Sequence, residues 1–266
     1  MHFVSKKTGG YRVYAVSGTN TVSFAIDFRE ANTKGLLGFA VEREDPAKGE
    51  RYFMFGMKVF ESVIPNPNSQ TEVKTFDHPV QSFVWDDFTA YDGRDYVYYF
   101  HPLKGTPKNL DRSAPAIRLA VKTEPLFSKN EHDIFFNRGV ASSQAYERRF
   151  GNRKPDKIED PKKRAEAFEW LSRKLDDGLI AFIKNAKSGD TLLGCFYEFR
   201  YLPAAEEFKA AHERGVKVKL ILDAKVNEHT DGKGKFHESF PREDNMRMVK
   251  EAKLPAVPRP VLWTQV

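Results

Sequence analysis

Polar and charged side chains follow three apolar stretches of the chain, at the points where strands are expected to end. They are Asn137, Arg138, Ser142 and Gln144 after the first stretch, Tyr197, Glu198 and Arg200 after the second, and Asp223 and Lys225 after the third. Open α/β sheets bind ligands at the carboxyl ends of their strands, and the planar fork of an arginine suits a phosphate group. These residues are therefore phosphate-binding or site-lining candidates, and an ordinary surface ion pair is the alternative for each.

The second and third groups depend on a strand, a helix and a second strand within Thr191–Lys225. Thr191–Tyr197 is an apolar, aromatic-rich run of strand length. Pro203 suits a first helical turn, where its missing N–H would have no partner, and Gly215 suits the end of the helix. Val216–Asp223 then reads as another strand. Two strands joined by one helix form a parallel, right-handed crossover unit, which predicts an α/β core.

The first group depends on a strand and a helix start. Asp133–Asn137 is predicted to be a short buried strand, and Ser142–Phe150 the start of a helix. Ser142 or Ser143 would be the N-cap, which places side-chain oxygens and free backbone amides at the strand end. This geometry can hold a phosphate, or it can simply cap the helix.

A long helix is predicted to begin at Asp160 and Pro161, with the aspartate as cap. Apolar residues at helical spacing form its expected core-facing stripe: Phe168, Leu171, Leu175, Leu179, Phe182 and Ala186. Arg242–Lys253 is a further candidate helix, and Val261–Trp263 looks like the start of another strand.

Residues 1–127 have a different pattern from the rest of the chain. The candidate strands are Tyr11–Ser17, Thr21–Phe28, Leu36–Arg43, Arg51–Phe60, Gln81–Phe88, Asp95–Pro102 and Ala116–Thr123. Short strands at near-regular spacing suggest an antiparallel β-sandwich. The stretch Val80–Pro107, with Trp85 as its buried aromatic, resembles the central strands of a fibronectin type III-like or immunoglobulin-like module. The expected fold class is an α+β two-domain chain, with an accessory β-sandwich domain over residues 1–127 and an α/β domain over residues 128–266.

Composition sets the class of protein. The chain has 266 residues, of which 40% are hydrophobic and 13% aromatic, which favours a globular protein. The net charge of +6 suits a phosphate-bearing partner or simply solvated helix faces.

The single cysteine, Cys195, allows no disulfide within the chain and is expected to be buried. The amino terminus has no apolar run long enough for a signal peptide or a membrane span. We expect a cytoplasmic protein that is not integral to the membrane.

Two stretches resemble a known family. They are FNRGVASSQAY at residues 136–146 and the FYEF and RGVKVKLILDAK runs at residues 196–199 and 214–225. Together they resemble the first half of a phospholipase D-like protein, over about residues 133–266. The resemblance implies hydrolysis of phosphodiesters by paired HxKxxxxD motifs, without a cofactor or metal. One histidine attacks phosphorus, its partner protonates the leaving oxygen, and the lysines hold the phosphate charge.

The family's catalytic motif is not found in these residues. None of the seven histidines has a lysine two positions later, and His212 with Arg214 comes closest. By the family's order the first motif would follow the strand near Val261. The chain is therefore expected to be the N-terminal portion of a phosphodiesterase for phospholipid or nucleic acid. It would be catalytically incomplete as given and would need a missing C-terminal half or a second chain. The alternative is a non-catalytic module that binds nucleic acid or anionic lipid.

Other catalytic patterns are also absent from the sequence, including the Walker A, GxGxxG, HExxH, CxxC and GxSxG motifs. His229 and His237, with Asp231 and Glu238, could bind a metal ion adventitiously. Their Gly- and Lys-rich setting favours a surface loop instead, so no metal site is predicted.

Overall fold

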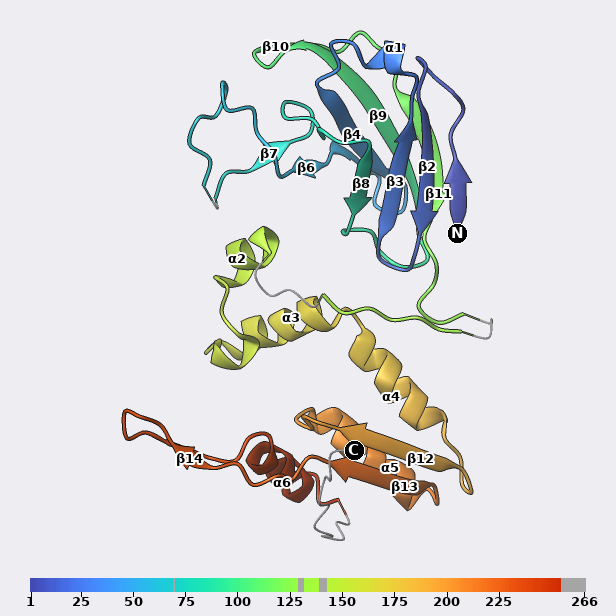
Figure 1. The fold of residues 1–266 in the computed structure, drawn as a ribbon. Coiled ribbons are helices and arrows are strands. Elements are labelled where there is room, and N and C mark those ends of the chain that lie inside the picture. The colour runs from blue at the N-terminus through green and yellow to red at the C-terminus, as the bar shows by residue number, and fades with distance from the viewer. Residues whose placement is uncertain (69, 129–131, 139–142, 255–266) are drawn as a thin grey trace. The chain divides into compact units, whose positions relative to one another are not determined.

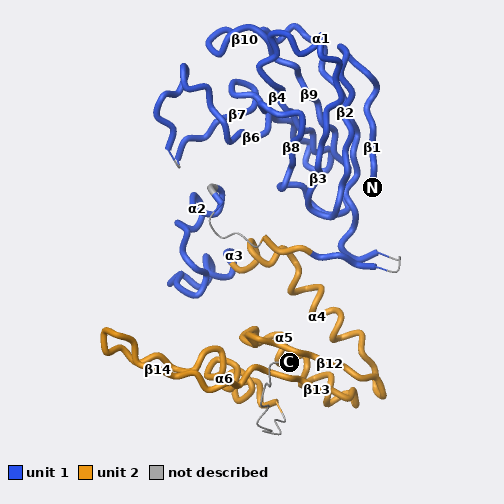
Figure 2. The backbone as a smooth tube through the Cα atoms, viewed as in Figure 1, with its two compact units in different colours: residues 1–135, 139–167 blue, residues 136–138, 168–266 orange. Residues whose placement is uncertain are grey.

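The computed structural model describes residues 1–68, 70–128, 132–138 and 143–254 (Figure 1). Contacts divide the chain into two compact units, residues 1–135 with 139–167 and residues 136–138 with 168–266 (Figure 2). The fold is mixed, with several antiparallel sheets and, over the described residues, six α-helices. The domain boundary predicted after residue 127 stays a prediction.

Over the described residues, the first unit contains two larger antiparallel sheets and one two-stranded antiparallel sheet. One has the order β1 (His2–Val4), β2 (Arg12–Ser17), β3 (Val22–Asp27) and β8 (Val84–Asp87). The other has the order β10 (Asn109–Asp111), β9 (Asp95–Thr106), β4 (Gly38–Asp45) and β5 (Glu50–Phe53), with β11 (Ile117–Lys122) also paired to β9. β6 (Phe55–Gly56) pairs with β7 (Val73–Lys74), and α1 (Glu30–Thr33) is a single turn. Every one of the seven predicted segments contains a strand, although Arg51–Phe60 is divided at Met54.

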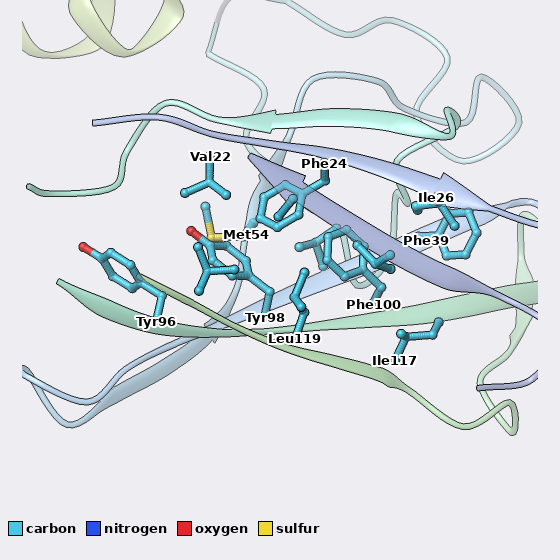
Figure 3. Packing of buried hydrophobic residues seen from close by; sticks show 14 of the residues in the cluster. Val22, Phe24, Ile26, Phe39, Met54, Tyr96, Tyr98, Phe100, Ile117 and Leu119 are labelled. Atoms are coloured by element: carbon cyan, nitrogen blue, oxygen red, sulfur yellow. The ribbon is translucent and has the colours of Figure 1, made fainter. Parts of the chain in front are cut away.

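Both sheets contribute to one hydrophobic core (Figure 3). Alternate residues of β3 are buried because successive side chains of a strand point to opposite faces. The ring of Phe24 on β3 lies 4.7 Å from that of Tyr98 and 5.1 Å from that of Phe100, both on β9 of the other sheet. Trp85 stacks on Phe24 but is only half-buried. Large aromatic side chains from both sheets therefore fill this core.

A buried ion pair links the two sheets. Arg43 on β4 and Asp87 on β8 are joined by 2.7 Å between Nη1 and Oδ2, and both side chains are almost fully buried. The hydroxyl of Tyr98 on β9 donates to the same carboxylate oxygen at 2.7 Å. Arg43 also donates to Thr89 and Tyr52. Such a network is stable only when its charges are mutually paired, because burial removes them from water.

Helices α2 (Gln144–Phe150) and α3 (Pro161–Ser172) begin where the sequence predicts. Ser143 Oγ accepts the N–H of Tyr146, so Ser143 is the N-cap of α2. Asp160 Oδ1 accepts the N–H of Lys162 at 2.8 Å at the start of α3. These side-chain acceptors satisfy backbone donors that have no partner within the first turn. A one-turn 3-10 helix, Pro155–Lys157, lies between the two helices.

The predicted long helix is interrupted, and that part of the prediction is wrong. Arg173 and Lys174 have φ values of 51° and 64°, which an α-helix cannot contain, and α4 begins anew at Leu175–Asn185. Asp176 and Asp177 favour this new start because acidic side chains stabilise a helix N-terminus. The predicted apolar stripe is also divided, and Phe182 is 68% exposed.

The second unit contains the predicted crossover. β12 (Thr191–Phe196) and β13 (Lys217–Leu222) pair in parallel, and α5 (Leu202–Glu213) connects them. Pro203 lies in the first turn of α5, and Gly215 adopts a φ of 91° after its end. The hairpin of β14 (His229–Thr230) and β15 (Phe236–His237) follows, and then α6 (Arg242–Glu251), as predicted. The predicted strand start at Val261–Trp263 lies outside the described residues.

Two further expectations are wrong. Asp133–Asn137 forms no strand, and Phe136 in it is 70% exposed; Phe135 instead packs its ring 5.2 Å from that of Phe127. Cys195 is exposed rather than buried. Over the described residues, the β12–β13 sheet buries side chains toward α5 and leaves its other face open, so Cys195 points to the open face.

No helix in the described part of the chain is long and apolar enough to cross a membrane.

Candidate functional site at the ends of two parallel strands

The second unit brings two of the three predicted groups to one edge. Tyr197, Glu198 and Arg200 follow β12, and Asp223 and Lys225 follow β13. The strands are parallel and Phe196 is paired with Leu222, so both leave the sheet at the same edge. The N–H of Asp223 donates to the carbonyl of Phe196 at 3.1 Å. This strand-exit edge, defined by residues 197–200 and 223–225, is the candidate site.

Asn245 on α6 fixes the geometry of the strand-exit edge. Its side chain is completely buried, and Nδ2 donates to the carbonyls of Tyr197 and Asp223, each at 2.9 Å. Oδ1 accepts the N–H of Phe199 at 2.7 Å. One amide therefore satisfies three backbone groups on both exits, which holds the two loops in register. The sequence analysis did not identify Asn245. The only sign of it in the sequence is that asparagine, a poor helix former, lies inside a predicted helix.

Arg200 is held between two carboxylates. Its guanidinium forms an ion pair with Glu198, and Nη1 lies 3.5 Å from Oδ2 of Asp244 on α6. The guanidinium carbon also lies 5.7 Å from the centre of the Phe240 ring. The Arg200 side chain is 52% exposed, so solvent and ligands can reach it. An incoming anion would share this cation with the two acidic side chains.

Lys225 supplies a second cation with a different environment. Oδ1 of Asp223 accepts the N–H of Lys225 at 2.9 Å, which turns the chain sharply after β13. The Lys225 side chain is exposed, and no ion pair to it is recorded over the described residues. Arg242, nearby on α6, donates from Nη1 to the carbonyl of Ala224 at 3.3 Å. In the described part of the chain, the edge thus combines one arginine shared by two carboxylates with one exposed lysine that has no ion-pair partner.

The hairpin beyond Lys225 is anchored but carries no metal centre. Asn227 makes two hydrogen bonds to the backbone of Phe240, at 2.7 and 2.8 Å. The rings of His229 and His237 stack with centroids 5.0 Å apart. His237 Nε2 lies 3.1 Å from Asp231 Oδ2, and this hydrogen bond holds the pKa of Asp231 below its ordinary value. Within the described residues, no group of three or more His, Cys, Asp or Glu side chains could hold a metal ion.

The first predicted group does not join the strand-exit edge as expected. Because residues 133–137 form no strand, Asn137 and Arg138 do not follow a strand of this sheet. The Arg138 guanidinium lies 3.9 Å from the centre of the Trp170 ring, and the backbone N–H of Arg138 donates to the carbonyl of Leu171. Gln144 begins α2, which belongs to the first unit. Ser142 lies outside the described residues.

Comparison with known proteins adds no assignment. No protein-family model matches the chain, and no curated protein matches its sequence. The strand-exit edge is therefore the basis for a proposed function.

Proposed function

We propose that the strand-exit edge binds the phosphodiester group of a nucleic acid or an anionic lipid. One observation carries this proposal: two parallel strand exits, fixed by Asn245, present Arg200 and Lys225 on the same edge. Arginine suits the paired oxygens of a phosphate, and lysine acts as a mobile point charge. The acidic residues around Arg200 limit the affinity, because the ligand must compete with them for its guanidinium.

A second candidate is the N-terminal portion of a phospholipase D-like phosphodiesterase. The resemblance of residues 136–146 and 196–225 to that family favours it, as does the parallel crossover unit. In this proposal the strand-exit edge positions the phosphodiester, and another segment or chain supplies the attacking histidine. Glu198 would orient that histidine. We further propose that the two sheets of the first unit form a fibronectin type III-like or immunoglobulin-like sandwich with an accessory role.

Binding is tested with a short single-stranded DNA oligonucleotide and, separately, with phosphatidylserine vesicles. Lys225→Gln should weaken binding about two- to fivefold at low salt and reduce the salt dependence, since fewer counterions are released. Lys219→Gln is the matched control, because Lys219 is exposed in the middle of β13 and away from the edge. Equal weakening by both substitutions would mean that only net charge matters, and would reject the strand-exit edge as the site.

Turnover separates the two candidates. Both candidates predict no hydrolysis of bis(p-nitrophenyl) phosphate by this chain alone, and they differ in what a second chain does. Hydrolysis by this chain alone would contradict both candidates, because neither places the attacking histidine in these residues. Hydrolysis that appears only on addition of a second chain carrying an HxKxxxxD motif would support the divided active site.

A further inference from the structure

The first unit contains a hollow whose lining is mostly polar. It lies between the β9–β10 hairpin and the segments on either side of β7, and its volume is about 580 Å³. This volume falls within the range of roughly 300–1,000 Å³ typical of small-molecule sites. Its polar lining includes Ser62, Asp77, His78, Lys108 and Arg112, and Leu110 is among its apolar residues. Three separate segments of the chain therefore converge on it.

Arg112 connects two of the segments that line this hollow, and its charge is paired with Asp77. Nη2 donates to Asp77 Oδ1 at 3.0 Å and to the carbonyl of Phe76 at 3.1 Å. The guanidinium carbon also lies 4.1 Å from the centre of the Phe76 ring. These contacts tie the end of the hairpin to the segment after β7. Arg112 is engaged by Asp77, whereas Lys108 is an exposed cation without an ion-pair partner among the described residues.

His78 supplies a neutral donor of defined tautomer. The residue is only 5% exposed, and its Nδ1 accepts the backbone N–H of Phe60 at 3.1 Å. A backbone N–H can only donate, so Nδ1 must carry a lone pair and the ring proton must lie on Nε2. The imidazole therefore offers one N–H from Nε2 to a partner. A hydroxyl, from Ser62, lies on the same lining.

We propose that this hollow binds a small organic carboxylate with an apolar body. Lys108, which has no ion-pair partner among the described residues, matches one negative charge, and a carboxylate has two oxygens, one for Lys108 and one for the N–H of His78. The apolar body packs against Leu110. A phosphate monoester fits less well, because its charge near pH 7 is about −1.5 to −2 and would leave excess negative charge. This site is separate from the strand-exit edge and does not depend on its function.

The experiment is an NMR titration of the full 266-residue chain with benzoate at low salt, with phenyl phosphate and benzyl alcohol as comparison ligands. Benzoate should shift the amide signals of residues 62–63, 77–78 and 108–112, and it should bind more tightly than either comparison ligand. Lys108→Gln should weaken benzoate binding about tenfold, since a charge-assisted contact is lost. Lys122→Gln is the matched control: Lys122 is exposed and pairs with Asp95 at the opposite end of β9.

Several results would overturn the proposal. Tighter binding of phenyl phosphate would reject the carboxylate class, and equal binding of benzyl alcohol would reject a role for charge. Shifts at residues 197–225 in place of the hollow would assign benzoate to the strand-exit edge. An unchanged affinity in Lys108→Gln, or the absence of saturable shifts, would remove the site altogether.

Discussion

Two clusters of arginine, carboxylate and aromatic side chains, one in each unit, contain similar groups in different surroundings. In the first unit Arg43 pairs with Asp87, and Tyr52 and Tyr96 lie beneath its guanidinium. In the second unit Arg200 pairs with Glu198 and Asp244 beside Phe240. The Arg43 side chain is 5% exposed and that of Arg200 is 52% exposed.

Burial decides what each cluster can do. A charge removed from water must keep its partner, because an isolated buried charge is very costly. The Arg43 cluster is therefore committed to joining the two sheets. An exposed pair is weakened by solvent and salt, so its members can exchange partners at little cost. The ion pairs of Arg200 can therefore exchange at little cost, and substitutions in the two clusters test this difference.

The largest effect is expected for Asp87→Ala. The substitution leaves Arg43 buried without its carboxylate and removes the acceptor of the Tyr98 hydroxyl. The free energy of unfolding of the first unit should fall by about 3–5 kcal/mol. Equilibrium urea unfolding, followed through the NMR amide signals of β3 and β9, measures it. Arg51→Ala is the control, since Arg51 pairs with Glu42 but is 51% exposed. A similarly small loss of the free energy of unfolding for both substitutions would contradict the difference between the buried and the exposed ion pair.

Asn245→Ala should have the next largest effect, in the second unit. It leaves the N–H of Phe199 and the carbonyls of Tyr197 and Asp223 without their side-chain partner. Each buried backbone group left unsatisfied costs about 1–3 kcal/mol, reduced where water can enter. Hydrogen exchange at the Phe199 amide should accelerate, and oligonucleotide binding should weaken together with it. Met246→Ala, at the neighbouring and more exposed position of α6, is the control. Unchanged protection of Phe199 would show that Asn245 does not fix the edge.

High pH should destabilise the first unit through Tyr98. Burial, and then the carboxylate of Asp87, raise the pKa of the Tyr98 phenol above its ordinary value. The unfolded chain loses this proton near pH 10 whereas the folded chain retains it, so stability is complete below about pH 10 and falls above it. One such group contributes a slope of up to about 1.4 kcal/mol per pH unit. Tyr98→Phe should make the measured slope shallower by about that amount. An unchanged slope would mean that other tyrosines account for it.

The sequence predicts helix ends and strands well where the signal comes from the residues of that segment alone. Pro203 and Gly215 marked the ends of α5, Asp160 marked the start of α3, and alternation marked the strands that contribute Phe24 and Tyr98 to the core. These signals are local, so they do not depend on distant packing.

Long-range features could not be predicted in the same way. The pairing of Arg43 with Asp87 joins residues 44 positions apart, and Asn245 reaches residues 46 and 48 positions away. The break at Arg173 and Lys174 lies in a sequence with continuous helical spacing. The exposure of Cys195 depends on which face of a sheet is covered, which its own strand does not encode. For the candidate site, the sequence placed Arg200 and Lys225 after strands but could not identify the residue that holds the exits together.

Glu198→Gln should have the smallest effect on stability. Unlike the other substitutions, it should strengthen binding. The exposed Glu198–Arg200 pair contributes about 1 kcal/mol or less, so the free energy of unfolding should barely change. Removing the carboxylate frees one side of the guanidinium, and oligonucleotide binding at low salt should strengthen about two- to fivefold. Arg200→Gln should instead weaken it, with a similarly small change in stability. If Glu198→Gln lowered stability as much as Asp87→Ala and left binding unchanged, the Arg200 cluster would also be structural. In that case the strand-exit edge would not be a binding site, because its arginine could not exchange a carboxylate for a phosphate.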